Sequence, residues 1–125
     1  TVPCGSLSGS SAPYLASGFY TVERNVEAFK LSLLDHGPSY FRYDVYSDFQ
    51  TWWNNPVSGI VYKQTQPNRV GGHAVLLIGW SDSRRAFLLK NSWGATGGPN
   101  GDGTFWMAYD GHKKNLNFQM FNISA

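Results

Sequence analysis

The strongest structural signal in this chain of 125 residues is a pair of apolar segments separated by a short polar run. Residues 73–80 read HAVLLIGW and residues 86–92 read AFLLKNS, whereas residues 81–85 between them are all polar or charged. Two apolar runs of strand length joined by such a turn predict a β-hairpin. The chain is therefore restricted to folds that contain an antiparallel sheet.

The hairpin brings two chemically distinctive residues toward one another. If the turn is centred on Asp82, His73 lies directly opposite Asn91 on the same face of the sheet. Opposite residues have Cβ atoms roughly 4.5–5.5 Å apart, which lets an imidazole and a carboxamide form a hydrogen bond. Because a slip of one residue would spoil this pairing, the register is a specific prediction.

A histidine held by an asparagine suits nucleophilic acyl transfer. The amide oxygen accepts from one ring nitrogen, which fixes the tautomer and leaves the other nitrogen to activate a nucleophile. A neutral amide suits a thiolate–imidazolium pair, because that pair needs less help than a serine hydroxyl. The alternative is a buried histidine bonded to a convenient neighbour. A lone histidine would favour that alternative, but His73 and Asn91 in these two contexts favour catalysis.

Four segments carry a resemblance to a known family: GGHAVLLIGW (71–80), FLLKNSWG (87–94), GDGTFWMAYD (101–110) and HGPSYFRYDVYSDF (36–49). Together they resemble the C-terminal half of papain-like cysteine proteases, and VYSDF is especially similar to the cathepsin B branch. The resemblance covers about residues 20 to 110. It implies a peptidase that acts on peptide or protein substrates without a cofactor or metal ion.

The resemblance also implies roles for individual residues. His73 matches the general base and acid that pairs with a Cys thiolate, and Asn91 matches the residue that orients it. Trp93 matches the indole that shields their hydrogen bond from water. Gly72 corresponds to the position whose backbone carbonyl binds the substrate, and Ala74 to the floor of a side-chain pocket.

Two positions depart from the family pattern. Arg42 falls where the family usually has a small apolar residue that lines the same pocket as Ala74. If Arg42 points inward, an acidic substrate residue is expected at this substrate-binding position. If it points outward, the register of this strand differs from that of the family. Residues 95–99 replace the usual second Trp-Gly, which alters the leaving-group side but not the His–Asn pair.

The one cysteine, Cys4, does not fit the role of the nucleophile. The family places its CGSCW-like run and oxyanion-hole Gln more than about a hundred residues before the histidine. Cys4 precedes His73 by only 69 residues and lacks the second Cys and the Trp of that run. We expect a former disulfide partner or a free thiol at Cys4, and the nucleophilic Cys and the Gln on a companion N-terminal half.

These 125 residues alone would then be incomplete and inactive. The alternative function is a catalytically inactive papain-like domain that binds peptides or a partner. A homodimer formed through the exposed half-interface is its expected form.

One helix is predicted near the start of the domain. Asn25 is a good N-cap, and Gly37 followed by Pro38 ends the helix. Apolar residues between them at i, i+3, i+7 and i+8 form one face of about three turns. These residues are Val26, Phe29, Leu33 and Leu34.

The rest of the domain reads as roughly six strands. These strands are expected at residues 39–46, 60–62, 73–80, 86–92, 104–109 and 117–123, and residues 15–23 also have strand character. Residues 97–103 favour a hairpin turn over a calcium loop, because the Asp/Asn alternation ending in a distant Glu is absent. We expect a flexible lead or linker remnant at 1–12. Residues 13–125 are then a β-rich α+β half-domain with an antiparallel barrel-like sheet.

Composition limits the remaining possibilities. Aromatic residues make up 16% of the chain and charged residues only 14%, so much apolar surface needs burial. The tandem Trp52-Trp53 either forms an exposed patch or packs locally, and the sequence favours neither. A net charge of +2 is too small to indicate nucleic-acid binding, and no stretch is apolar enough to span a membrane. An extracytoplasmic or secreted location follows from the resemblance alone.

Overall fold

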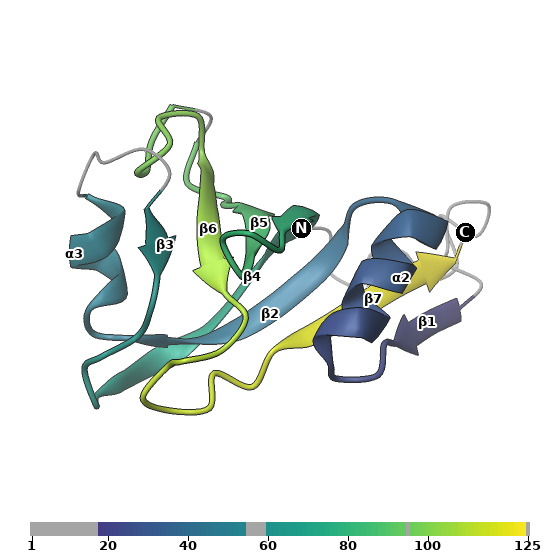
Figure 1. Ribbon diagram of the computed structural model, residues 1–125, viewed down its shortest axis with the longest axis horizontal. Helices are drawn as coiled ribbons and strands as arrows, with labels where there is room; N and C mark the ends of the chain where they lie inside the picture. The colour runs from purple at the N-terminus through teal and green to yellow at the C-terminus, as the bar shows by residue number, and fades with distance from the viewer. Residues whose placement is uncertain (1–17, 55–59, 95, 125) are drawn as a thin grey trace, which may run out of the picture.

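The computed structural model describes residues 18–54, 60–94 and 96–124 (Figure 1). In chain order the elements are β1 (Gly18–Thr21), α2 (Val26–His36), β2 (Ser39–Tyr46), α3 (Phe49–Trp53), β3 (Val61–Tyr62), β4 (Arg69–Ser81), β5 (Ala86–Lys90), β6 (Thr104–Ala108) and β7 (Gln119–Ser124). This composition of elements confirms the predicted β-rich α+β class. Cys4 and the predicted lead at 1–12 lie outside the described residues.

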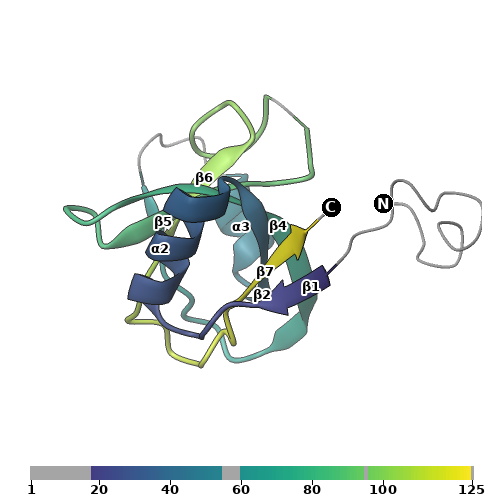
Figure 2. The ribbon, with the colours of Figure 1, turned by 90° about the vertical axis from the view of Figure 1, so that its right-hand side faces the viewer.

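The strands form one sheet in the order β1-β7-β2-β4-β5-β6-β3. All neighbouring pairs are antiparallel except β3 and β6, which are parallel. The two longest strands, β2 and β4, pair with one another and run through the middle of the sheet (Figure 1). Figure 2 shows α2 lying across the sheet, where it packs against β4 and β7. No helix among the described residues is long and apolar enough to cross a membrane.

The core is built largely from aromatic rings. Phe41, Tyr43, Phe49 and Phe105 are fully buried, and their neighbouring rings meet mostly edge to face. The tandem tryptophans belong to the same cluster, because Trp53 is buried and Trp52 is partly buried against it. Local packing is therefore the correct interpretation of Trp52-Trp53.

Helix α2 begins and ends where the sequence predicts. The side chain of Asn25 accepts a hydrogen bond from the Ala28 N–H at 2.7 Å, and Gly37 ends the helix with φ of 76°. The predicted buried face is wrong at one position, because Leu34 is 70% exposed. Ser32 is buried in its place, and its hydroxyl accepts a hydrogen bond from Asn122.

The short helix α3 was not expected from the sequence. Its five residues are too few to display a helical period, and three of them are aromatic residues that also suit strands. Asp48 precedes α3 and accepts hydrogen bonds from the Tyr62 hydroxyl and the Thr65 N–H, at 2.7 and 2.8 Å. Asp48 thereby ties the start of α3 to the segment that begins with β3.

The glycine-rich run before β6 forms the predicted turn between two antiparallel strands. The Gly101 N–H donates to the Gly98 carbonyl, and the Gly103 N–H donates to the Gly97 carbonyl. Gly98 has φ of +83°, and a Cβ there would lie 2.6 Å from the ring of Trp53. A larger residue would strain the backbone and collide with the aromatic cluster.

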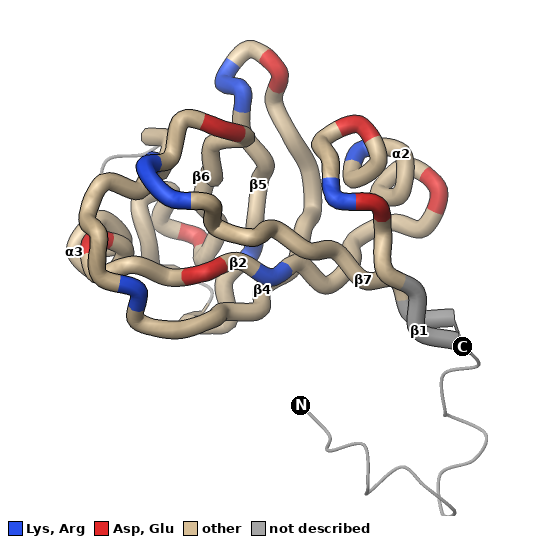
Figure 3. The backbone as a smooth tube through the Cα atoms, turned by 90° about the horizontal axis from the view of Figure 1, so that it is seen from below, with Lys and Arg blue, Asp and Glu red and all other residues tan. Residues whose placement is uncertain are grey.

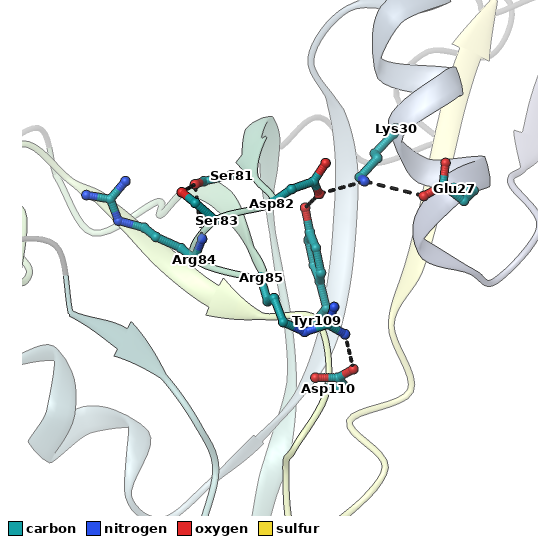
Figure 4. A network of polar contacts seen from close by, with 9 residues as sticks. All are labelled: Glu27, Lys30, Ser81, Asp82, Ser83, Arg84, Arg85, Tyr109 and Asp110. Atoms are coloured by element: carbon teal, nitrogen blue, oxygen red, sulfur yellow. Dashed lines mark hydrogen bonds and ion pairs between the residues drawn. The ribbon is translucent and has the colours of Figure 1, made fainter.

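A polar network joins α2 to the turn between β4 and β5 (Figure 4). The Lys30 ammonium lies 2.6 Å from an Asp82 carboxylate oxygen, and the Tyr109 hydroxyl donates to the same oxygen at 2.8 Å. Lys30 also lies over the Tyr109 ring, 5.5 Å from its centroid. These contacts hold the outer end of the hairpin against the helix.

Candidate active site

His73 and Asn91 meet, but not through the register predicted from the sequence. The Nε2 of His73 lies 2.8 Å from the Oδ1 of Asn91. Within β4 and β5, however, pairing runs only from Leu76 opposite Lys90 to Ser81 opposite Ala86, so the turn is centred between Ser83 and Arg84. The prediction of directly opposite strand positions is therefore wrong, although the predicted contact is confirmed.

A break in the ladder explains the difference. The register of β4 against β5 shifts between Leu77 and Gly79, where β4 carries one extra residue. His73 pairs instead with Tyr43 on β2, and β5 ends one residue before Asn91. Among the described residues, the stretch of β4 that carries His73 pairs with β2 alone, and Asn91 reaches the histidine from the end of β5.

The surroundings of Asn91 fix the orientation of its amide. Its backbone N–H donates to the Gly103 carbonyl at 2.8 Å, and its side-chain oxygen accepts from the Ser92 N–H at 2.7 Å. Only 4% of Asn91 is exposed. The oxygen that accepts from Ser92 also faces His73, so Nε2 must be the donor and Nδ1 is the nitrogen that remains for chemistry.

The His73 ring contacts two aromatic side chains. The Trp93 ring tilts over it with centroids 5.2 Å apart, and the Tyr43 ring meets it edge-on at 5.7 Å. Trp93 also contacts Trp53 and Phe49 in the core cluster. Trp93 is nevertheless 42% exposed, so one side of this arrangement faces solvent in the described structure.

Three buried polar side-chain atoms have no hydrogen-bond partner within residues 18–54, 60–94 and 96–124. They are the Asn91 Nδ2, the Tyr43 hydroxyl and the Trp52 Nε1. Burial raises the pKa of the Tyr43 phenol well above its ordinary value, so the hydroxyl stays protonated. Unpartnered buried groups of this kind cost free energy, and in native proteins they often lie at functional sites.

The other expected substrate-binding residues share the opposite face of β4. Gly72 and Ala74 are exposed there, and Arg42 on β2 pairs directly with Ala74. A Cβ on Gly72 would lie 2.7 Å from the Nη2 of Arg42, so the guanidinium lies directly over Gly72. The sequence left open whether Arg42 points inward or outward. The register places Arg42 on the same face as Ala74, which is the inward orientation.

Sequence reasoning missed the partners of Arg42. Its guanidinium forms an ion pair with Asp44, and Arg69 binds the same carboxylate oxygen at 3.1 Å. Asn117 donates to the second oxygen at 2.7 Å. Burial alone would raise the pKa of Asp44, but the hydrogen bonds from Arg69, Asn117 and Arg42 hold it below its usual value.

One part of this cluster was readable from the sequence. Arg42 and Asp44 are two residues apart on a predicted strand, so they had to share a face. Figure 3 shows acidic and basic backbone segments close together where β2 and β4 run side by side. Arg69 and Asn117 come from distant parts of the chain, and no local pattern connects them to Asp44.

Known proteins are similar to this chain in sequence and in fold. Residues 3–123 match the model of the papain family of cysteine proteases. The chain is 35% identical over 94 residues to the cathepsin B-like cysteine proteinase 6 of Caenorhabditis elegans. The aligned region covers 74% of this chain and 24% of that protein. It thus spans about a quarter of that relative.

Two solved structures have a similar backbone. Procathepsin B S9 from Trypanosoma congolense superposes with a TM-score of 0.68 at 22% identity, over 87% of this chain and 36% of that one. Xylellain, a cysteine protease from Xylella fastidiosa, gives 0.64 at 27% identity, over 91% and 42%. Because the family model matches nearly the whole chain, the chain belongs to the papain family of cysteine proteases.

Proposed function

We propose that this chain supplies the catalytic imidazole and its orienting amide to a papain-type peptidase site. The observation that carries the proposal is the contact between His73 Nε2 and Asn91 Oδ1, which leaves Nδ1 as the nitrogen for proton transfer. A Cys-bearing half, on the same polypeptide or on a separate chain, completes the site with the nucleophile and the oxyanion hole. The limited share of its relatives that the chain spans supports this division.

The reaction needs His73 as both base and acid. Nδ1 accepts the thiol proton, and the thiolate attacks the peptide carbonyl carbon to give a tetrahedral intermediate. The C–N bond then breaks, and the imidazolium gives its proton to the leaving amine. Water attacks the carbonyl carbon of the resulting thioester and gives one proton to the imidazole. The C–S bond then breaks to release the acid product, and the imidazolium returns its proton to the thiolate.

Peptide hydrolysis tests the proposal. The protein from its natural source should hydrolyse a peptide substrate, and His73→Ala should abolish that activity. His36→Ala provides a matched control, because His36 is exposed in the last turn of α2. The 125-residue chain alone should show no hydrolysis. Hydrolysis by that chain that is lost on His73→Ala would contradict the proposed division of the site.

A second candidate is a papain-like domain that binds peptides or a partner without cleaving them, including as a homodimer. It is favoured by Arg42, which places a charge where the family usually has a small apolar residue. It predicts that the natural protein binds peptides but hydrolyses none.

An extracytoplasmic or secreted location remains a proposal that rests on family resemblance.

A further inference from the structure

On the side of β4 opposite to the His73 side chain, the exposed face of β2 and β4 combines one basic group with small and apolar side chains. Successive rungs of the ladder on this face pair Asp44 with Gly72 and Arg42 with Ala74, and the next rung pairs two exposed apolar residues. These last residues are Tyr40 and Leu76. The face is therefore accessible, and Arg42 lies near its middle.

The charges of the cluster do not cancel. Arg42 and Arg69 both bind Asp44, so two positive charges meet one negative charge and one positive charge remains in excess. Asp44 is buried, whereas 27% of the Arg42 side chain is exposed. The excess charge can therefore meet a ligand from the side of Arg42.

Arg42 also retains donors for a ligand. Its Nη2 contacts Asp44 and its Nη1 donates to the Asn117 carbonyl at 3.5 Å, a long hydrogen bond. A guanidinium carries five N–H donors in a rigid fork that matches a carboxylate. Asp44 fixes the position of the fork over Gly72, which precedes the catalytic histidine in the chain.

We infer that Arg42, held by Asp44, forms a carboxylate-binding subsite that selects peptide substrates with a Glu or Asp side chain close to the scissile bond. The inference rests on the proposed peptidase function, because it treats the bound peptide as a substrate. Recognition of the carboxylate itself needs no cysteine. Arg42 is a specificity-determining residue, and Asp44 is the residue that positions it.

An NMR titration of the 125-residue chain tests the subsite. Two acetylated peptide amides that differ only in Glu or Gln serve as probes. The Glu peptide should shift the Gly72 and Ala74 amide signals and the Arg42 Nε–H signal, with affinity roughly tenfold above that of the Gln peptide. Added salt should reduce this difference, since Arg42 is partly exposed.

Variants separate the subsite from general charge. Arg42→Gln should remove the preference for Glu. Arg84→Gln, which removes an equal charge from the exposed turn between β4 and β5, should retain the preference. If Arg42→Gln loses its dispersed amide spectrum, Gly72→Ala replaces it, because the added Cβ would displace the guanidinium while its charge remains.

Three results would overturn the inference: equal affinity for the two peptides, a preference that survives Arg42→Gln or Gly72→Ala, or no shift with either peptide at millimolar concentration. These results are independent of hydrolysis by the natural protein, so failure of the subsite and failure of the peptidase proposal can be told apart.

Discussion

Asn91 determines which nitrogen of the His73 ring takes part in their hydrogen bond. Its oxygen is oriented by the Ser92 N–H and held by the backbone bond to Gly103, so it can only accept from the imidazole. The sequence predicted this contact from a hairpin register that is wrong, and the motifs around both residues favoured the same pair. The route to it was not predictable, because nothing in the apolar pattern reveals the extra residue between Leu77 and Gly79.

Asn91→Ala should release the His73 ring and leave the Ser92 N–H without its acceptor. We expect a loss of about 1–3 kcal/mol in the free energy of unfolding, and a fall in peptide hydrolysis by the natural protein on the order of 100-fold. In 15N NMR spectra of His73, the single Nε2–H form should become a mixture of tautomers. An unchanged tautomer would show that Asn91 does not orient the ring.

Tyr43→Phe should leave stability unchanged or raise it by up to about 1 kcal/mol, because the buried hydroxyl has no partner within the described residues. The ring contacts with His73 and Phe49 would persist. Urea denaturation of the two proteins measures the difference. If Tyr43→Phe instead lowered the free energy of unfolding by more than about 1 kcal/mol, the hydroxyl would have to form a stabilising hydrogen bond.

At the scale of elements, local signals gave reliable boundaries and less reliable faces. Asn25 and Gly37 marked both ends of α2 correctly, because caps depend on the residues next to them. The face of α2 depends on where the sheet lies, and only the fold shows that Ser32 rather than Leu34 meets it. The short α3 gave no periodic signal at all.

The adjacent leucines of α2 provide a matched test of this correction. Leu33 is 9% exposed within the core and Leu34 is 70% exposed. Leu33→Ala should cost about 2–5 kcal/mol, whereas Leu34→Ala should change the free energy of unfolding by less than about 0.5 kcal/mol. Similar losses for both variants would contradict the orientation of the helix.

Across the whole molecule, the sequence motifs anticipated the fold and the His–Asn pair, but not the contacts between distant segments. Asp44 binds Arg69, which lies on β4, and Asn117, which lies in the segment before β7. His112 likewise joins two segments, since its Nδ1 accepts from the Gln64 N–H and its Nε2 donates to the Ala108 carbonyl. Such contacts arise only once the chain is folded.

His112 should make the fold less stable in mild acid. Burial lowers its pKa below the ordinary value of about 6.5. The unfolded chain therefore binds a proton first, so stability is highest above about pH 6.5 and falls as the pH drops toward the folded pKa. Urea denaturation at about pH 7.5 and about pH 5 should show this loss, and His112→Gln should reduce it. An equal loss of stability in the His112→Gln variant would show that other groups cause it.

We propose that His73 serves a cysteine that lies outside these 125 residues. Treatment of the natural protein with an epoxysuccinyl thiol inhibitor, followed by mass spectrometry to locate the adduct, tests this assignment. We expect one labelled cysteine on a Cys-bearing half that stays with this chain under native conditions, and labelling should be lost on His73→Ala. An adduct on Cys4, or labelling that survives His73→Ala, would show that His73 does not serve such a cysteine.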